Sequence, residues 1–435
     1  MQTHDLDLLY TRYLQCGGVV STDTRNLPAG CMFFALKGPN FNANSLAPKA
    51  LAQGAAFAVI DEVPESENEC FILVQDVLQT LQQLANYHRR QLKIPFLAIT
   101  GSNGKTTTKE LVREVLSKKF RTLATKGNLN NHIGVPLTLL SIRSDIEFAV
   151  IEMGANKQGD IEELANIAEP DFGIITNIGK AHLEGFGGLD GVARGKSELY
   201  YFLFRRKGLA FVNGNQQKLV ELSNRLENVI TYGSNQLTLF SPIQIKVEML
   251  AFNPTVIFAL PGRSEVVTHL GGTYNFENIM TAIAVGKHFG VNDEGIETAI
   301  AAYAPDNMRS QIIEKGSNRI LMDAYNANPT SMEHALRNFS LAEHNKKVVI
   351  LGDMFELGTE GPAEHQRVAD TARGLGFERV LFAGSVFSKV LAGQPDVYAT
   401  TADLISEVKN SKFENTFILI KGSRSMRLEE VLEHL

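Results

Sequence analysis

Residues 98–108, Ala-Ile-Thr-Gly-Ser-Asn-Gly-Lys-Thr-Thr-Thr, combine glycines, a lysine and hydroxyl groups in a spacing suited to binding phosphate. An apolar run at 95–100 leads into the glycines, and a stretch with helical periodicity at 104–118 follows them. At such a turn the backbone N–H groups and the helix N-terminus face an anion. Lys105 would reach the terminal phosphates, and the Thr106 hydroxyl would bind Mg²⁺. The sequence therefore predicts a binding site for ATP or GTP.

The predicted phosphate loop is shorter than the general pattern. That pattern has a glycine five residues before Gly104, where this chain has Ile99. A chance Gly-Lys-Thr in a surface loop is the alternative interpretation. The strand predicted before the loop and the helix predicted after it favour phosphate binding.

A carboxylate and an imidazole lie at or just after the ends of two later predicted strands. Glu152 ends the strand predicted at 147–152, and His182 comes shortly after the strand predicted at 172–177. Parallel strands bring their carboxyl ends to one edge of a sheet, where ligands bind in open α/β folds. Glu152 is therefore a candidate Mg²⁺ ligand, because Mg²⁺ needs only one or two carboxylates beside the phosphates. Each residue also has a structural alternative, a helix cap or ion pair for the glutamate and a packing position for the histidine.

Further polar groups stand at the starts and ends of elements predicted later in the chain. Asn275 and Asn278 lie three residues apart and share one helical face, where their amides could read a purine edge or simply cap the helix. Asp323, at a predicted strand end, could bond ribose hydroxyls. Arg309 could reach a phosphate as a permanently charged donor. Lys196 has the sequence position of an ordinary solvated lysine on a helix.

The elements that must position these groups alternate between strands and helices, which predicts an α/β fold with a mostly parallel central sheet. We divide the chain into a small α/β domain at 1–92, a central domain at 93–305 and a C-terminal domain at 306–435. The predicted strands are at 31–36, 56–60, 71–74, 95–100, 147–152, 172–177, 208–212, 319–324, 347–352, 378–383 and 416–420. The predicted helices are at 76–92, 104–118, 159–168, 191–204, 275–289, 330–343, 362–374, 401–409 and 426–434. Short strands within 229–270 indicate an antiparallel patch.

Composition limits the classes of function. A chain of 435 residues is too long for one ordinary core and suggests two or three domains. The net charge of -6 argues against nonspecific binding of nucleic acid, which needs an excess of cations. No apolar run is long enough to cross a bilayer, and the N-terminus lacks a secretory pattern. The three cysteines fit neither a zinc site nor a disulfide framework, so we expect a cytoplasmic protein that does not insert into membranes.

Together these motifs resemble those of the Mur ligase family over nearly the whole chain. The loop at 100–107 is similar to the short phosphate loop of that family, with Ser102 where threonine is usual. Other landmarks of the resemblance are Glu-Met-Gly-Ala at 152–155, His-Leu-Glu at 182–184, Tyr-Asn-x-x-Asn at 274–278 and Asp-Ala-Tyr-Asn-Ala-Asn-Pro at 323–329. The last of these and the segments 351–358, 421–424, 22–25 and 34–38 resemble the branch of the family that adds D-alanyl-D-alanine.

The resemblance implies both a fold and a reaction. It implies a UDP-substrate-binding N-terminal domain, a central ATPase domain and a Rossmann-like C-terminal domain. The expected reaction joins UDP-N-acetylmuramoyl-tripeptide to D-alanyl-D-alanine through an acyl phosphate made from ATP, and we expect a monomer. A Mur ligase that adds the third peptide residue is one alternative, but its Asp-Asn-Pro-Arg motif is missing. A folylpolyglutamate synthase would lack the N-terminal domain, and a nucleotide-dependent switch would want an Asn-Lys-x-Asp motif that this sequence does not have.

The resemblance also implies roles for individual residues. Nucleotide contacts are expected from Gly101, Asn103, Gly104, Lys105, Thr106, Thr107, Asn275, Asn278, Arg309 and Asp323. Two Mg²⁺ sites are expected from Thr106, Glu152, His182 and a carbamylated Lys196. Catalysis is expected to depend on Lys105, His182, Lys196 and Arg309. Arg309 would touch the γ-phosphate only after the C-terminal domain closes. Substrate contacts are expected from Thr24, Arg25, Lys37, Asn130, Asn131, Asn326, Asn328 and Asp353.

Overall fold

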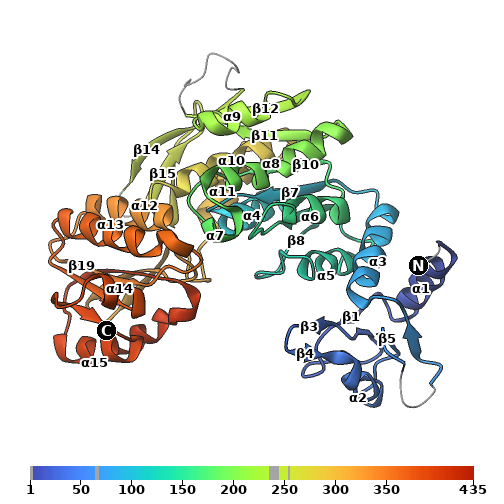
Figure 1. The fold of residues 1–435 in the computed structure, drawn as a ribbon. Helices are drawn as coiled ribbons and strands as arrows, with labels where there is room; N and C mark the ends of the chain where they lie inside the picture. The colour runs from blue at the N-terminus through green and yellow to red at the C-terminus, as the bar shows by residue number, and fades with distance from the viewer. Residues whose placement is uncertain (1–2, 64–67, 235–243, 253–254) are drawn as a thin grey trace.

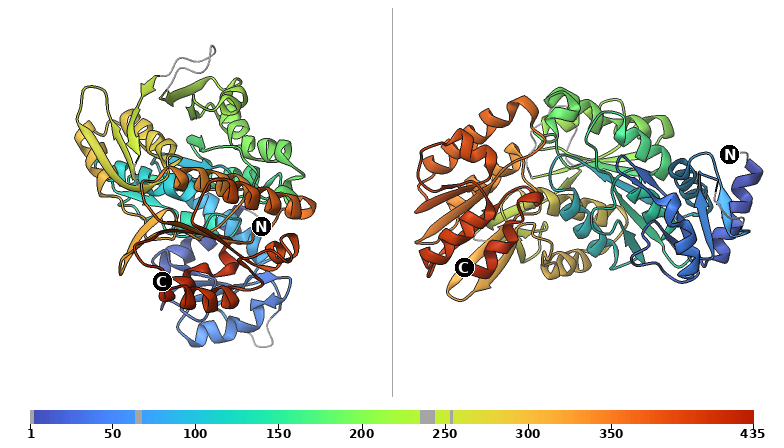
Figure 2. Two further views of the ribbon diagram at one scale, coloured as in Figure 1. Left: turned by 90° about the vertical axis from the view of Figure 1, so that its left-hand side faces the viewer. Right: turned by 60° about the horizontal axis from the view of Figure 1, so that its bottom comes forward.

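The chain forms three units that follow one another along the sequence (Figure 1). The computed structural model describes residues 3–63, 68–234, 244–252 and 255–435. The central unit lies between the N-terminal and C-terminal units, as the right-hand view of Figure 2 shows. Each unit contains its own sheet, so the predicted three-part α/β organisation is present.

The N-terminal unit is a small parallel sheet with helices. Its strands are in the order β1-β2-β5-β6, and their bounds are β1 Val20–Ser21, β2 Met32–Phe34, β5 Phe57–Ile60 and β6 Phe71–Leu73. The other elements are α1 Thr3–Gln15, α2 Ala47–Ala52, α3 Val77–Gln91 and the hairpin of β3 Lys37–Gly38 with β4 Phe41–Asn42. The sequence predicted the last three strands of the sheet and α3, but not α1 or the hairpin. Helix α3 packs against the central unit.

The central sheet is parallel throughout the part of the chain that is described, with the order β13-β12-β11-β10-β7-β9-β8. The bounds are β7 Phe96–Thr100, β8 Thr122–Ala124, β9 Phe148–Glu152, β10 Phe172–Ile175, β11 Leu209–Asn213, β12 Asn228–Gly233 and β13 Ile245–Lys246. The helices are α4 Lys105–Leu116, α5 Gly134–Leu140, α6 Asp160–Ala168, α7 Leu183–Phe186, α8 Leu189–Arg206 and α9 Gln217–Ser223. Strand β7, which leads into the glycine loop, lies between β9 and β10. The predicted convergence of three strand ends is therefore confirmed.

An antiparallel patch follows the central sheet, made of β14 Glu248–Phe252, β15 Thr255–Ala259 and β16 Glu265–Gly271. The prediction of antiparallel strands within 229–270 is right for these strands and wrong for β12 and β13. The second half of β12 is buried beside β11, so this strand extends the parallel sheet instead. Helix α10 Asn275–His288 then packs along α4, and α11 Asp293–Ala302, which the sequence analysis missed, follows it.

The C-terminal unit has the strand order β17-β18-β22-β19-β20-β21, in which β17 is antiparallel to β18 and the other pairs are parallel. Its strands are β17 Gln311–Lys315, β18 Asn318–Asp323, β19 Lys347–Gly352, β20 Arg379–Ala383, β21 Val397–Tyr398 and β22 Phe417–Lys421. Its α-helices are α12 Pro329–Leu341, α13 Gly361–Gly374, α14 Ser385–Val390 and α15 Thr401–Ser411. The helix predicted at 426–434 is a 3₁₀ helix, η4 Leu428–His434, and it begins only after Arg427, which adopts a left-handed conformation with φ of 51°. None of the described helices is long and apolar enough to span a bilayer.

Candidate nucleotide site

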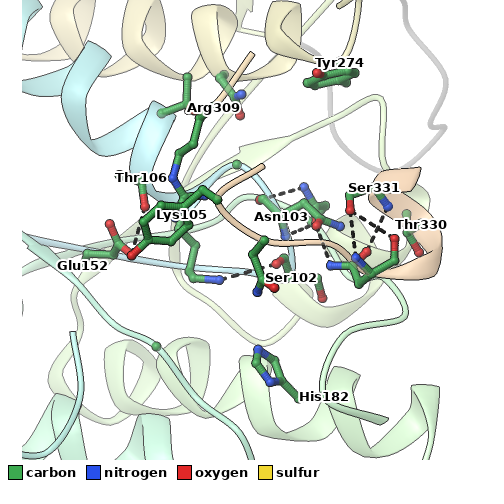
Figure 3. A pocket seen from close by; sticks show the side chains of 18 of the residues that line it. Ser102, Asn103, Lys105, Thr106, Glu152, His182, Tyr274, Arg309, Thr330 and Ser331 are labelled. Atoms are coloured by element: carbon green, nitrogen blue, oxygen red, sulfur yellow. Dashed lines mark hydrogen bonds between the residues drawn. The ribbon is translucent and has the colours of Figure 1, made fainter. Parts of the chain in front are cut away.

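A cavity of about 1410 Å³ opens at the carboxyl ends of β7, β9 and β10 and extends to the C-terminal unit. Most of the predicted site residues line it, from the glycine loop, the strand ends, α10 and the start of the C-terminal unit. These residues are Asn103, Gly104, Lys105, Thr106, Thr107, Asn130, Asn131, Glu152, His182, Asn275, Asn278, Arg309, Asp323, Asn326 and Asn328. Figure 3 shows Lys105, Thr106 and Glu152 grouped beside the loop, with His182 apart from them.

Two glycines allow the loop its path. Gly101 has φ of 145°, and a Cβ there would lie 1.9 Å from Oγ1 of Thr176 at the end of β10. Gly104 is the N-cap of α4 with φ of 79°, and a Cβ there would lie 2.5 Å from Oδ1 of Asn278. A side chain at either position would clash and would also need an unfavourable backbone conformation. The glycines thus let the loop fit between β10 and α10 while α4 begins at the lysine.

Side-chain amide and hydroxyl groups of three other residues hold Asn103 in the loop. Its backbone N–H donates to Oδ1 of Asn177 (2.9 Å), and its carbonyl accepts from Nδ2 of Asn177 (3.0 Å) and from Oγ1 of Thr176 (2.6 Å). Its side-chain oxygen accepts from Nδ2 of Asn328 in the C-terminal unit (2.7 Å). The C-terminal unit therefore contacts the glycine loop directly in this structure.

Glu152 has the surroundings of a cation ligand. It is 1% exposed, and its Oε1 accepts from Thr106 Oγ1 (3.2 Å) and from Asn130 Nδ2 (2.7 Å). Its Oε2 is buried and has no hydrogen-bond partner among the described residues. Nζ of Lys109 lies 4.0 Å from that oxygen. A buried carboxylate oxygen without a donor, beside a threonine hydroxyl, is a donor set of the oxygen type that Mg²⁺ prefers.

Lys105 is the first residue of α4, and its Nζ donates to the carbonyl oxygens of Gly101 (2.7 Å) and Ser102 (3.4 Å). The pKa of the Lys105 ammonium is lowered to about 8, mainly by burial. The negative charge of Glu152 raises this pKa in part, and the cation of Arg309 lowers it further. An anion bound at this helix end would reverse the effect, because it would favour the charged ammonium. The charged form of Lys105 is therefore unfavourable in the free protein and is stabilised when a phosphate binds.

We expect the affinity for ATP to fall as the pH rises above about 8. Above that pH Lys105 is deprotonated in the free protein, whereas bound phosphate raises the pKa of Lys105 and keeps it protonated. Binding of ATP then requires the uptake of a proton, so the affinity falls by up to about tenfold per pH unit. The dissociation constant of ATP measured from pH 7 to pH 9 tests this. Lys105→Arg keeps its charge over that range and should show a flat profile. An equally flat profile for the unsubstituted protein would contradict the expectation.

Asn275 and Asn278 form a chain of buried amides. Nδ2 of Asn278 donates to Oδ1 of Asn275 (2.7 Å), and Nδ2 of Asn275 donates to the carbonyl of Gly271 (2.6 Å). Oδ1 of Asn278 accepts from Thr108 in α4 (3.0 Å). These bonds tie α10 to the helix that carries Lys105, so both asparagines position the loop in addition to lining the cavity.

The link between the central and C-terminal units places Arg309 at the cavity. Its guanidinium lies 3.9 Å from the ring centroid of Tyr325, and its buried Nε has no hydrogen-bond partner among the described residues. The carboxylate of Asp323 accepts from the Ser310 backbone N–H (3.0 Å) and forms an ion pair with Lys421 (2.5 Å). Arg309 therefore retains a free donor for an anion, whereas much of the hydrogen-bonding capacity of Asp323 is used within its own unit.

His182 and Lys196 have different environments. His182 has φ of 52°, and its Nδ1 lies against the carboxylate of Glu356 in the C-terminal unit. Lys196 is 1% exposed, does not line the cavity, and donates to the carbonyl of Ala155 at 3.4 Å. Burial, and next the Lys105 cation, lower the pKa of Lys196 well below its usual value. Lys196 is thus a buried, poorly paired amine, not the solvated lysine that its position in the sequence suggests.

Other predicted residues lie away from the cavity. Both oxygens of Asp353 accept backbone N–H groups at the start of α14, each at 2.9 Å, and the residue is 1% exposed. Arg25 pairs with Asp23 on the surface, and Lys37 pairs with Asp61 (2.8 Å). The described residues include no group of three or more histidine, cysteine, aspartate or glutamate side chains that could hold a metal. Of the metal ligands predicted here, Thr106 and Glu152 are brought into direct contact.

Two family matches cover most of the central and C-terminal units. Residues 99–286 match the Mur ligase middle domain, and residues 308–424 match the domain described as Mur ligase, glutamate ligase domain. The UDP-N-acetylmuramoyl-tripeptide--D-alanyl-D-alanine ligase of Bacillus subtilis is 34% identical over 96% of this chain and 92% of its own length. The chain belongs to the Mur ligase family.

Further relatives of this Mur ligase agree in both sequence and fold. The ligase of the same name from Escherichia coli is 36% identical over 96% of this chain and 93% of its own length. The crystal structure of MurF from Acinetobacter baumannii is 32% identical, with a TM-score of 0.84 over 95% of this chain and 92% of that one. A folylpolyglutamate synthase from Mycobacterium tuberculosis is 15% identical with a TM-score of 0.60, which shows a shared fold alone.

Two residues that shape the site of this Mur ligase, Asn177 and Lys109, were not predicted from the sequence. Asn177 is bonded to the loop backbone, and Lys109 is fully buried beside Glu152. Lys421, in the segment 421–424 that the sequence did single out, lines the cavity and pairs with Asp323. Lys109 could have been noticed, because it lies four residues after Lys105 and so on the same face of α4. The role of Asn177 depends on how β10 ends, which no local pattern indicates.

Proposed function

We propose that this Mur ligase joins UDP-N-acetylmuramoyl-tripeptide to D-alanyl-D-alanine with ATP, in the synthesis of the peptidoglycan precursor. The observation that carries the proposal is the glycine loop with Lys105 and Glu152, set in one cavity with residues of the C-terminal unit. Ligases named for this reaction in Bacillus subtilis and Escherichia coli match nearly the whole chain, including the N-terminal unit. We further propose that the enzyme acts in the cytoplasm as a monomer, with domain boundaries at 92/93 and 305/306.

The proposed reaction needs cations because two anions must meet. The terminal carboxylate of the tripeptide attacks the γ-phosphate of ATP, the bond to the β-phosphate oxygen breaks, and ADP leaves. Lys105, at the N-terminus of α4, stabilises the charge that builds on the transferred group. The neutral amine of D-alanyl-D-alanine then attacks the carbonyl carbon of the acyl phosphate. A C–N bond forms, the C–O bond to the phosphate breaks, and inorganic phosphate leaves while the amine loses a proton. The C-terminal unit, which contacts the loop at Asn328, covers this site and excludes water.

Mg²⁺ fits this donor set, and Thr106 and Glu152 would hold it. A second ion would be held by His182 together with Lys196, if that lysine becomes carbamylated. Bound Mg²⁺ would neutralise phosphate charge in the ternary complex. UDP-substrate contacts are proposed for Thr24, Arg25 and Lys37 in the N-terminal unit, and substrate contacts in the cavity for Asn130, Asn131, Asn326 and Asn328.

Product formation from defined substrates tests the proposed function. Purified protein is incubated with ATP, Mg²⁺ and UDP-N-acetylmuramoyl-tripeptide, with and without D-alanyl-D-alanine. We expect phosphate release that needs both acceptor and dipeptide, and a pentapeptide product by mass spectrometry. Phosphate release that needs neither substrate, or a product formed with a different amino acid, would overturn the substrate assignment while leaving the nucleotide site intact.

Arg309→Ala is expected to raise the KM for ATP about tenfold or more, the effect of losing a charge-assisted hydrogen bond. Its guanidinium faces the cavity with a free buried donor and lies close enough to Lys105 to lower the pKa of that lysine. Binding of the UDP-substrate, measured by calorimetry, should not change. Weaker UDP-substrate binding with an unchanged KM for ATP would show that Arg309 acts elsewhere.

A further inference from the structure

The segment 177–182, between β10 and α7, contacts both the glycine loop and the C-terminal unit. On one side, Oγ of Ser102 donates to the carbonyl of Gly179 (3.0 Å) and accepts from its N–H (2.9 Å). Gly179 is buried, and a Cβ at this residue would lie 3.2 Å from Oγ1 of Thr330 in α12. The segment is therefore in contact with the loop and with the C-terminal unit through the same residue.

Lys180 extends this contact to two helices of the C-terminal unit. Its backbone N–H donates to Oγ1 of Thr330 in the first turn of α12 (3.0 Å). Its ammonium forms an ion pair with Glu364 in the first turn of α13, whose side chain is 8% exposed. A single residue of the central unit thus binds the starts of both α12 and α13.

Glu364 belongs to a wider charge network that joins these helices. Arg367 donates to Glu364 (2.8 Å) and to Glu333 of α12 (2.6 Å). Burial raises the pKa of the Glu364 carboxyl, but Lys180 and Arg367 outweigh that effect and hold its pKa below the usual value. The carboxylate at the interface is therefore charged at neutral pH and is paired from both sides.

We propose that Lys180 is a positioning residue that holds the C-terminal unit closed on the glycine loop. Lys180 is not part of the candidate nucleotide site, since its side chain does not line the cavity. Closure maintained through Thr330 and Glu364 keeps Asn328 against Asn103. It also keeps Arg309, at the base of the C-terminal unit, beside Lys105. The expected effect on kcat rests on the proposed ligase reaction, whereas the expected effect on closure does not depend on it.

The first test measures closure without any substrate. The radius of gyration from small-angle X-ray scattering should be larger for Lys180→Met than for the unsubstituted protein, and Lys180→Arg should restore it. Arg263→Met is the matched control, because it removes an ion pair with Glu297 that lies within the central unit. Equal radii for Lys180→Met and the unsubstituted protein would overturn the proposal, whether or not the ligase reaction is correct.

The second test uses the ligase assay. Lys180→Met should lower kcat about tenfold, the size of one charged hydrogen bond, while the dissociation constant of the UDP-substrate stays within about twofold. Glu364→Gln also weakens the pair with Arg367, so its effect should be at least as large. The double variant should be no worse than Glu364→Gln alone, since Lys180→Met removes a contact that Glu364→Gln has already removed. Effects that multiply, or a kcat for Lys180→Met within about twofold of the original, would overturn the proposal. If the unsubstituted protein makes no pentapeptide, the proposed function fails and the scattering result still decides on Lys180.

Discussion

Lys105→Ala is expected to lower the rate of phosphoryl transfer by about 10³-fold, as when a preorganised donor to a developing anion is removed. The lysine is the first residue of α4, so its ammonium and the helix N-terminus act on the same bound group. Its Nζ is held by the carbonyls of Gly101 and Ser102, which keep it at the loop before any nucleotide binds. The rate of ADP formation with both other substrates present measures the effect.

The fold should survive this substitution. Burial already disfavours the charged form of Lys105, so removing the ammonium relieves a desolvation penalty instead of breaking an ion pair. A melting temperature close to that of the unsubstituted protein would establish this. Lys118→Ala is the matched control, because it removes an exposed lysine just after the same helix and should keep full turnover. Near-normal turnover of Lys105→Ala would mean that the nucleotide phosphates bind elsewhere.

The residues that lie at the ends of β7, β9 and β10 could be predicted from the sequence. Buried apolar runs followed by Lys105, Glu152 and His182 predicted β7, β9 and β10, and parallel pairing then brings their ends together. The glycines were predictable for the same reason, since a short turn into a helix needs positive φ at Gly104. Local pattern was enough because each of these features depends on a few consecutive residues.

Contacts between units could not be predicted from local pattern. Asn328 was expected to bind substrate, and it lines the cavity, but its amide also reaches Asn103, 225 residues earlier in the chain. Asp353 directly follows β19, much as Glu152 ends β9, and both acids were expected to bind ligands. Gly384 lets α14 begin against that carboxylate, since a Cβ there would lie 2.2 Å from its Cγ. Tertiary packing thus turns one strand-end acid toward a cavity and another into a helix cap.

Lys196 is the residue whose environment differs most from its sequence pattern, because its helix spacing suggests solvent and the structure buries it. Its Nζ lies 5.3 Å from the ring centroid of Phe186, and the backbone of Gly195 leaves room for that ring. Burial lowers the pKa of Lys196 and so favours its neutral form, which is the form of an amine that can attack CO₂. The neutral amine forms an N–C bond to CO₂ and releases one proton, which leaves a carbamate anion. Burial therefore supplies the condition that the proposed modification needs.

Lys196→Ala is accordingly expected to lower turnover about 10²-fold or more, through the loss of an anion that stabilises the charged complex. Added bicarbonate should not restore activity, since no amine remains, whereas short carboxylic acids such as acetate should restore part of it by replacing the carboxylate. Incubation of the unsubstituted protein with ¹³C-labelled bicarbonate should give a carbamate signal by NMR that Lys196→Ala lacks. Lys196→Gln, which is neutral and of similar size, separates the loss of the anion from the loss of packing against Phe186, and it should be as inactive as the alanine variant. An unimpaired alanine variant, or a missing carbamate signal in the unsubstituted protein, would leave Lys196 as a buried amine with a packing role.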